Sequence, residues 1–250
     1  MKIIACYSNK GGVGKTATSV NLAYALAEAG KRVLLCDLDP QGASSFYFRV
    51  KPSRKLTDEQ FFKDEDRFVK SIRGSNYDDL DILPANMSFR NFDVFLSRMK
   101  NSRSRLKKSL KAVKKDYDVI LLDCPPNIST LSESVFKASD VVLVPVIPTT
   151  LSQRTFEQLV DFFKANDIPL KKLAAFFSMV QNVKSLHGEL MDEMTSQYKK
   201  QFLSAYVPFT SDVERMGVHR APVLASAPGC AASKAYQDLY REMRKKVALK

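Results

Sequence analysis

A short stretch near the start of the chain has the residue types of a phosphate-binding loop. Asn9-Lys10-Gly11-Gly12-Val13-Gly14-Lys15-Thr16 directly follows an apolar run over residues 3–7. The glycines let the backbone bend so that successive N–H groups point at phosphate oxygens. Lys15 can reach the β- and γ-phosphates of a nucleotide, and the Thr16 hydroxyl can ligate magnesium. The expected nucleotide contacts are Gly11, Gly12, Val13, Gly14, Lys15, Thr16 and Ala17.

The loop departs from the standard phosphate-loop pattern. Where G-x-x-x-x-G-K-[ST] has its first glycine the chain has Asn9, and a further lysine, Lys10, lies five residues before Lys15. Two lysines that bracket a glycine turn favour an anion close to them. A glycine-rich turn with chance lysines is the alternative interpretation. An apolar run before the loop and a helical pattern over 16–29 after it favour the phosphate site.

Carboxylates follow two other apolar runs. Asp37 and Asp39 come at the end of the run that starts at residue 32, and they share one side if the strand continues that far. Asp123 ends the run 118–123. Each aspartate alone could cap a helix or form a turn, but an acid at a strand tip beside a phosphate loop is typical of a magnesium site. We expect Thr16, Asp37 and Asp123 to serve the metal.

Apolar runs alternate with helical patterns throughout. They predict strands at 2–7, 32–37, 80–84, 118–123, 140–146, 172–179 and 203–207, and helices at 16–29, 88–115, 130–138, 151–165, 185–200 and 231–248. Continuously apolar strands are typical of a parallel sheet that is covered on both faces. The sequence therefore predicts an α/β fold, a doubly wound, mostly parallel sheet, with ligands at the carboxyl ends of its strands. Residues 51–77 are polar, with one short helix expected at 58–72.

Composition indicates the cellular setting and the kind of partner. The chain has 250 residues, a net charge of +12 and four cysteines without a CxxC-type pair. An excess of positive charge of this size suggests a polyanion, either nucleic acid or an acidic membrane surface. The sequence shows no secretory signal and no apolar stretch long enough to span a bilayer. We expect a cytoplasmic protein with one domain over 1–250 and no separate N-terminal DNA-reading domain.

Three motifs together resemble the ParA/MinD family of deviant-Walker P-loop ATPases. They are Lys10-Gly11-Gly12-Val13-Gly14-Lys15-Thr16, then Asp37-Leu38-Asp39-Pro40-Gln41-Gly42, then Tyr117-Asp118-Val119-Ile120-Leu121-Leu122-Asp123-Cys124-Pro125-Pro126. The Asp-Pro-Gln and Asp-Cys-Pro-Pro forms are closer to the ParA branch. The resemblance extends over nearly the whole chain.

The resemblance implies a homodimer that sandwiches ATP and Mg²⁺. In such proteins the residue matching Lys10 reaches the partner's phosphates, the one matching Asp39 helps to position the attacking water, and Lys15 holds phosphate. Lys10, Lys15 and Asp39 are therefore the expected catalytic residues. Pro208 lies where the family often places an adenine-contacting loop, although the usual polar residues are absent.

The resemblance also implies a cellular role. ParA-like ATP dimers bind nonspecific DNA and so associate with the nucleoid. A cognate adaptor on a cargo, such as a plasmid, a chromosome or a protein cluster, stimulates hydrolysis and releases them. Without that adaptor, hydrolysis in the family is generally slow.

Positive charge is concentrated in one helical stretch. Residues 98–115 contain nine Lys/Arg and no acid, and apolar residues recur there at helical spacing. A solvated helix face is the alternative, but this imbalance favours a bound polyanion. Further basic clusters lie at 215–220 and 241–250. We expect phosphate contacts without sequence specificity from Arg103, Arg105, Lys107, Lys108, Lys111, Arg220, Arg241 and Arg244.

Two alternatives come from the same superfamily. A MinD-like membrane switch needs an amphipathic C-terminal helix, and the final helix carries Tyr236, Leu239, Tyr240, Met243 and Val247 on one side. The resemblance suggests that this helix packs on the domain, so stable membrane binding is not expected. A metal-cluster carrier or reductase needs paired cysteines at the dimer axis, which the sequence lacks.

Overall fold

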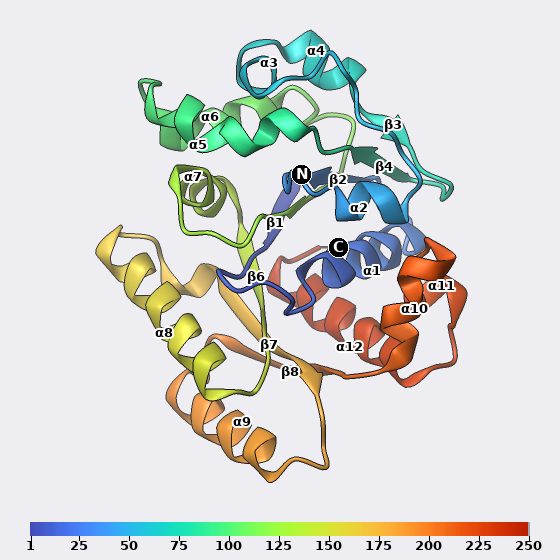
Figure 1. Cartoon of the computed structure of the whole chain (residues 1–250), viewed down its shortest axis with the longest axis vertical. Coiled ribbons are helices and arrows are strands. Elements are labelled where there is room, and N and C mark those ends of the chain that lie inside the picture. Colours follow the sequence, from blue (N-terminus) through green and yellow to red (C-terminus); the bar gives the residue numbers. More distant parts are fainter. Residues whose placement is uncertain (250) are drawn as a thin grey trace.

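A computed structural model describes residues 1–249 and places an eight-stranded sheet through the centre of the molecule (Figure 1). The strands are β1 (Lys2–Cys6), β2 (Val33–Asp37), β3 (Arg73–Gly74), β4 (Leu80–Leu83), β5 (Val119–Asp123), β6 (Val141–Val146), β7 (Leu173–Val180) and β8 (Phe202–Pro208). Their order is β3-β4-β2-β5-β1-β6-β7-β8, and β3 runs antiparallel to β4 while the other neighbours are parallel. The predicted mostly parallel sheet is confirmed.

Helices cover both faces of this sheet. They are α1 (Lys15–Glu28), α2 (Ala43–Tyr47), α3 (Asp58–Lys63), α4 (Glu65–Lys70), α5 (Phe92–Ser97), α6 (Ser102–Lys111), α7 (Thr130–Ala138), α8 (Thr150–Ala165), α9 (Ser185–Gln197), α10 (Ser211–His219), α11 (Val223–Ser226) and α12 (Ala231–Lys246), with short 3₁₀ turns η1 (Met87–Asn91) and η2 (Leu170–Lys172). One buried core joins the sheet to α1 and α12 through Leu26 and Leu239, and the other joins it to α7 and α8 through Phe136 and Phe163.

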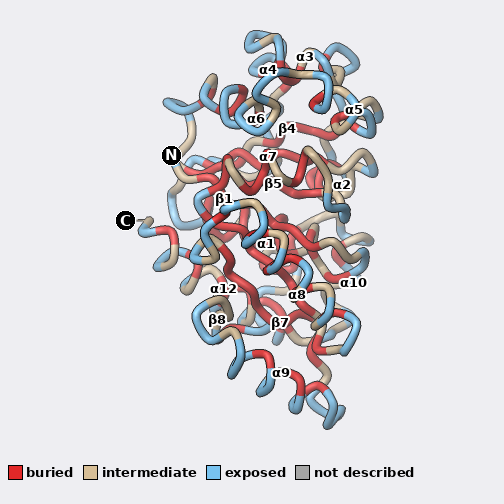
Figure 2. The backbone as a smooth tube through the Cα atoms, turned by 90° about the vertical axis from the view of Figure 1, so that its left-hand side faces the viewer, coloured by how far each residue is buried: buried red, intermediate tan, exposed pale blue. Residues whose placement is uncertain are grey.

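The parallel strands give the molecule two functionally different edges. The carboxyl edge is where β1, β2 and β5 end. The predicted phosphate loop follows β1 and leads into α1, and the predicted metal aspartates are the last residues of β2 and β5. The amino edge is where these strands begin, and α6, α7 and α12 approach it. In Figure 2 the two chain termini lie together at the left side, while α2 and α10 lie at the right.

Two predicted helices were wrong in extent. The single helix expected over 88–115 is divided into η1, α5 and α6, and α5 is separated from α6 where Asn101, just before α6, has a left-handed φ of 59°. The helix expected at 58–72 is two helices, α3 and α4, separated at Asp64, whose side chain accepts from the Arg67 N–H and caps α4. The strand β3 and the short helices α2, α10 and α11 were not predicted.

An aromatic cluster holds the 51–97 segment on the sheet. Phe61, Phe68, Phe89 and Phe92 are each 2% exposed or less. Phe92 contacts Phe89 with ring centroids 4.3 Å apart and Phe61 at 5.0 Å. These contacts join α3, η1 and α5 into one packed layer, and the aromatic residues belong to the same core as the strands of the sheet.

We expect Phe92→Ala to lower the free energy of unfolding by about 3–5 kcal/mol, because it empties a fully packed site. Urea unfolding of the purified chain measures this loss. Val94→Ala, on the same helix at a position that is 52% exposed, is the matched control and should cost less than about 0.5 kcal/mol. Equal effects of the two substitutions would show that the aromatic layer does not contribute to the cooperative fold.

Candidate nucleotide site

The phosphate loop joins β1 to α1 at the carboxyl edge, as predicted. Gly12 and Gly14 have positive φ values of 72° and 91°, a conformation that strains any residue with a side chain. A Cβ added at Gly14 would lie 3.1 Å from the Ser178 hydroxyl on β7. Gly14 also precedes the first residue of α1, so the N–H groups of the helix N-terminus face the loop. The loop therefore has both the shape and the dipole that a phosphate group needs.

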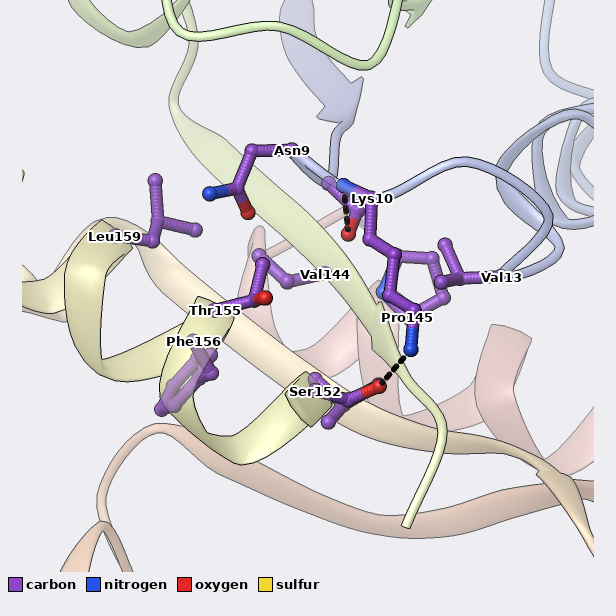
Figure 3. Close-up of a pocket in the computed structure, with 11 residues that line it drawn as sticks. Asn9, Lys10, Val13, Val144, Pro145, Ser152, Thr155, Phe156 and Leu159 are labelled. Atoms are coloured by element: carbon purple, nitrogen blue, oxygen red, sulfur yellow. Dashed lines mark hydrogen bonds between the residues drawn. The ribbon is translucent and has the colours of Figure 1, made fainter. Parts of the chain in front are cut away.

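Both loop lysines are turned toward their own chain. Lys15 is 7% exposed, and its Nζ donates to the Lys10 carbonyl oxygen at 3.1 Å. Figure 3 shows Lys10 reaching from the loop to Ser152 in the first turn of α8, where its Nζ donates to the hydroxyl at 3.0 Å. The two cations thus occupy different places: Lys15 lies inside the loop, whereas Lys10 points out of it.

Two aspartates lie side by side beneath the loop. Asp37 and Asp123 are register partners at the ends of β2 and β5, and they are 0% and 1% exposed. Asp37 Oδ2 accepts from the Ser45 N–H at 2.8 Å and from its hydroxyl at 2.7 Å. Asp123 accepts from the Ser44 hydroxyl at 2.6 Å and the Ser19 hydroxyl at 3.1 Å. Ser19, Ser44 and Ser45 belong to no sequence motif from which these contacts could have been predicted.

Burial raises the pKa of both carboxyls. The charge of Asp123 raises the pKa of Asp37 further, while the hydrogen bonds from Ser45 lower it. Around Asp123, the hydrogen bond from Ser44, the nearby Thr16 hydroxyl, the hydrogen bond from Ser19 and then the charge of Lys15 lower the pKa and so act against the burial. Two buried carboxylates so close together are therefore stabilised by a proton or a cation.

The donor set fits magnesium. Asp37 Oδ1 is buried and has no hydrogen-bond partner within the described residues 1–249. Thr16 lies close enough to Asp123 to lower the pKa of that carboxyl, which places its hydroxyl beside the same pair. Residues 1–249 contain no group of three or more His, Cys, Asp or Glu that could hold a metal. Magnesium suits such a site, since it is bound by one or two carboxylates together with substrate phosphates and water.

Asp39 is separate from this buried pair. The strand β2 ends at Asp37, so Asp39 lies in the following turn and does not continue the strand. Its Oδ1 accepts from the Gln41 N–H at 3.0 Å, and its carbonyl accepts from the Gly42 N–H at 2.9 Å. The Asp39 carboxylate is partly exposed and lies outside the buried pair, and its charge contributes to the raised pKa of Asp37.

The residues predicted to bind nucleic acid fall into three positions. Arg103 pairs with Glu133 at 2.6 Å, and Arg241 pairs with Asp238 at 2.7 Å. Arg220 lies at the carboxyl edge, where its Nε donates to the Phe46 carbonyl at 3.0 Å and its guanidinium lies 4.4 Å from that ring. The others belong to α6 and the end of α12, and within residues 1–249 they form no ion pair: Arg105, Lys107, Lys108, Lys111 and Arg244.

Pro208, the residue predicted to contact the adenine, ends β8. It lines a hollow of about 440 Å³ together with Asn182, Tyr206, Lys234 and Asp238. This hollow offers both apolar and polar groups. The adenine contact of Pro208 stays a prediction.

Comparisons with known proteins identify the family to which this chain belongs. A family model described as an AAA domain matches residues 1–172. The sporulation initiation inhibitor protein Soj of Bacillus subtilis is 30% identical over 247 residues, which cover 97% of this chain and 98% of Soj. The chromosome partitioning protein ParA of Caulobacter vibrioides is 28% identical over 250 residues, covering 97% of this chain and 94% of that protein. The chain belongs to the ParA branch of the ParA/MinD family of P-loop ATPases.

A solved structure agrees with the fold of this ParA-family chain. A putative plasmid partition protein from Borrelia burgdorferi, bound to AMPPNP, superposes with a TM-score of 0.83 at 21% identity, covering 98% of this chain and 99% of that one. This superposition confirms the predicted fold class, and the family model and Soj confirm the family resemblance drawn from the three motifs.

We expect Asp37→Asn to stabilise the protein in the absence of metal. Because the pKa of Asp37 is higher in the folded than in the unfolded state, the folded protein binds more protons and its stability falls as the pH rises above the range where an unfolded aspartate ionises. At pH values above the folded pKa, Asn should raise the free energy of unfolding by about 1.4 kcal/mol for each pH unit that separates the folded from the unfolded pKa of Asp37. Thermal unfolding with EDTA across the pH range measures this change.

The same variant should lose the extra stability that Mg²⁺ with a nucleotide confers, since one of the metal carboxylates is gone. Asp39→Asn, in the exposed turn, serves as the control for the stability without metal and should change it little. An Asp37→Asn protein less stable than the wild type at every pH would show that the Ser45 hydrogen bonds outweigh the repulsion.

Proposed function

We propose that this chain is a ParA-like positioning ATPase. It binds ATP with Mg²⁺, dimerises across the carboxyl edge, binds DNA without sequence preference, and is released when an adaptor on its cargo stimulates hydrolysis. The family membership and the partition proteins among its relatives support this role. The cargo is a plasmid, a chromosome or a protein cluster, and the site of action is the nucleoid in the cytoplasm.

The site supports ATP hydrolysis because its residues supply the needs of phosphoryl transfer. Lys15 and the loop N–H groups would cradle the phosphates, while Thr16, Asp37 and Asp123 would hold magnesium. A magnesium ion held there would supply positive charge against the charge that develops on the phosphates. Asp39, on its exposed turn, orients the attacking water, which needs positioning more than activation.

One observation carries the dimer: Lys10 lies outside the cradle of its own loop. Its Nζ is held by Ser152 rather than by the turn that contains Lys15. A cation placed there can reach phosphates across an interface after it leaves Ser152. Exposed apolar side chains on loops and helix starts of the carboxyl edge supply a surface for such an interface, namely Met87, Val94, Ile128, Leu151 and Phe209.

The alternative of a membrane switch is not favoured by the final helix. Of the five residues that would insert into a bilayer, Tyr236, Leu239, Met243 and Val247 are each 3% exposed or less, and Tyr240 is partly buried. They pack in the core that contains α1. Within the described residues, no helix has the length and apolar character that a membrane crossing would need. The basic charge is therefore assigned to DNA.

We expect Asp39→Ala to bind ATP normally but to hydrolyse it about 100-fold more slowly or worse, because the attacking water loses its orienting group. Phosphate release and nucleotide titration measure the two properties. Lys15→Ala is the contrasting variant and should lose nucleotide binding itself. Normal hydrolysis by Asp39→Ala would mean that the catalytic residue is assigned wrongly.

The trapped Asp39→Ala protein also tests the whole proposal. With ATP it should form a dimer that binds unrelated DNA sequences, and this binding should weaken steeply as salt increases. With ADP or without nucleotide the binding to long DNA should be much weaker. A failure to bind any DNA in the ATP state would refute the positioning role as proposed.

We expect Lys10→Gln, introduced into the Asp39→Ala background, to retain ATP binding but to remain monomeric with ATP. The reason is that Lys10 lies outside its own phosphate cradle and acts on the partner's phosphates. Light scattering after size exclusion measures the mass. The control is Lys184→Gln in the same background, an exposed lysine that should leave the dimer intact. A dimer that persists in Lys10→Gln would assign dimerisation to other groups.

A further inference from the structure

The short helix α2 lies directly against the two buried carboxylates. The Ser44 hydroxyl donates to Asp123 Oδ2 at 2.6 Å, and Ser45 donates to Asp37 Oδ2 through both its N–H and its hydroxyl. The Ser45 hydroxyl also accepts from the Ala85 N–H at 3.0 Å, which ties it to the loop after β4. The orientation of α2 therefore determines how its serines meet the two aspartates.

The helix α2 is too short to hold this orientation by itself. It has five residues, and an isolated helix of that length is not stable in water. Its inner face is fixed, because Ser44 and Phe48, four residues apart, are both buried. Phe46 points the other way and is 48% exposed. A helix that is held on its inner face alone can still rotate about that face, so its position depends on what holds the outer face.

Two arginines connect this outer face to the end of α10. The Arg220 Nε donates to the Phe46 carbonyl oxygen at 3.0 Å, and its guanidinium lies 4.4 Å from the centre of the Phe46 ring. In the opposite direction, Arg49, just after α2, donates from its Nη2 to the His219 carbonyl oxygen at 2.9 Å. Both carbonyls lie in the last turn of a helix, where the dipole favours a cation. We call these reciprocal contacts the arginine clasp.

Both arginines of the clasp have a left-handed backbone conformation. The φ angle is 58° at Arg49 and 50° at Arg220, which is the C-cap residue of α10. Residues with a Cβ rarely adopt this conformation, and glycine is the usual residue at such a helix end. Glycine would supply the turn without strain but has no guanidinium. Arginine at both turns, in spite of the strain, indicates that the two side chains have a function there.

The opposite side of α10 is attached to α1, the helix that begins at the phosphate loop. Asn21 of α1 is 0% exposed, and its Nδ2 donates to Met216 Sδ of α10 at 3.3 Å. Its Oδ1 accepts from the Leu224 N–H, in α11, at 3.2 Å. The contacts thus form a closed path from the phosphate loop along α1 to α10, across the arginine clasp to α2, and from α2 to the carboxylates.

We propose that Arg220 is a positioning residue for the magnesium site, with Arg49 as its counterpart. Its side chain acts through α2, which it fixes so that Ser44 and Ser45 hold the two aspartates in the arrangement that binds the metal. This inference rests on the proposed function and deepens its magnesium-binding step. It gives Arg220 a role at the nucleotide edge in place of the predicted contact to nucleic acid.

The experiment compares three variants of the full chain. Arg220→Gln removes the charge and shortens the side chain, whereas Arg220→Lys keeps a cation that can donate to a carbonyl and lie over a ring. Arg215→Gln is the matched control, because Arg215 is exposed on the same helix and forms no ion pair within residues 1–249. Calorimetry measures the ATP affinity of each protein at a series of free Mg²⁺ concentrations and in EDTA. Thermal unfolding in EDTA reports whether each variant folds.

We expect Arg220→Gln to need about tenfold more Mg²⁺ for the half-maximal gain in ATP affinity, which is the lower end of the effect of residues that support metal ligands. Its ATP affinity in EDTA should match the wild type, because the clasp acts on the carboxylates rather than on the phosphate loop. Arg220→Lys should recover most of the Mg²⁺ response. Arg49→Gln, which breaks the other half of the clasp, should shift it in the same direction as Arg220→Gln, and Arg215→Gln should leave it unchanged.

A dependence on the two serines separates positioning from a general structural role. If Arg220 acts through α2, its effect should be much smaller in a protein that already carries Ser44→Ala and Ser45→Ala, since the hydroxyls it positions are gone. The full tenfold effect of Arg220→Gln in that background would overturn the inference.

Three further outcomes are distinct from one another. Equal Mg²⁺ requirements of Arg220→Gln and the wild type would overturn the inference and leave the proposed function standing. Loss of DNA binding by Arg220→Gln with an unchanged Mg²⁺ response would also overturn it and return Arg220 to the predicted nucleic-acid residues. A wild-type protein that does not bind ATP with Mg²⁺ would refute the proposed function itself.

Discussion

The repulsion between two buried carboxylates is the constraint on which the nucleotide site depends. Asp37 and Asp123 end neighbouring strands in register, so the sheet itself forces them together. Serines from α1 and α2 satisfy three of their four oxygen-atom positions in part, and Asp37 Oδ1 is left over. A bound cation would stabilise a fold in which such a carboxylate oxygen is buried without a partner. The site can therefore couple metal and nucleotide binding to the stability of the strands and loops around it.

Direct contacts connect the two carboxylates to helices at the carboxyl edge. Ser44 and Ser45, which hold the two carboxylates, lie in α2. The same helix contains Phe46, whose carbonyl and ring are both engaged by Arg220 at the end of α10. A change at the metal pair is thus joined by direct contacts to α2 and then to the helices that pack against α12. Arg220 therefore connects the end of α10 to α2 at the carboxyl edge.

Much of the fold and of the site could be predicted from sequence because its signals are local. Continuous apolar runs mark buried parallel strands, and the loop around Gly14 needs glycine for reasons that its own backbone imposes. The break at Asn101 could not be predicted, since the basic pattern over 98–115 reads equally well as one helix. Ser19, Ser44 and Ser45 could not be predicted either, because only the three-dimensional fold brings hydroxyls to the carboxylates. The hollow at the amino edge of the sheet shows the same limit, because the six lysines that line it come from five separate elements.

Both lysines of the phosphate loop form hydrogen bonds within their own chain. Lys15 donates to the Lys10 carbonyl, and Lys10 donates to Ser152 in the first turn of α8, where the helix dipole is positive and disfavours a cation. The hydrogen bond to Ser152 offsets part of this cost, and Thr149 shares the same hydroxyl at 3.0 Å. A phosphate group that draws Lys15 away from the Lys10 carbonyl also removes one restraint on the loop that carries Lys10. The Lys10 carbonyl therefore links the position of Lys15 to the loop that carries the outward lysine.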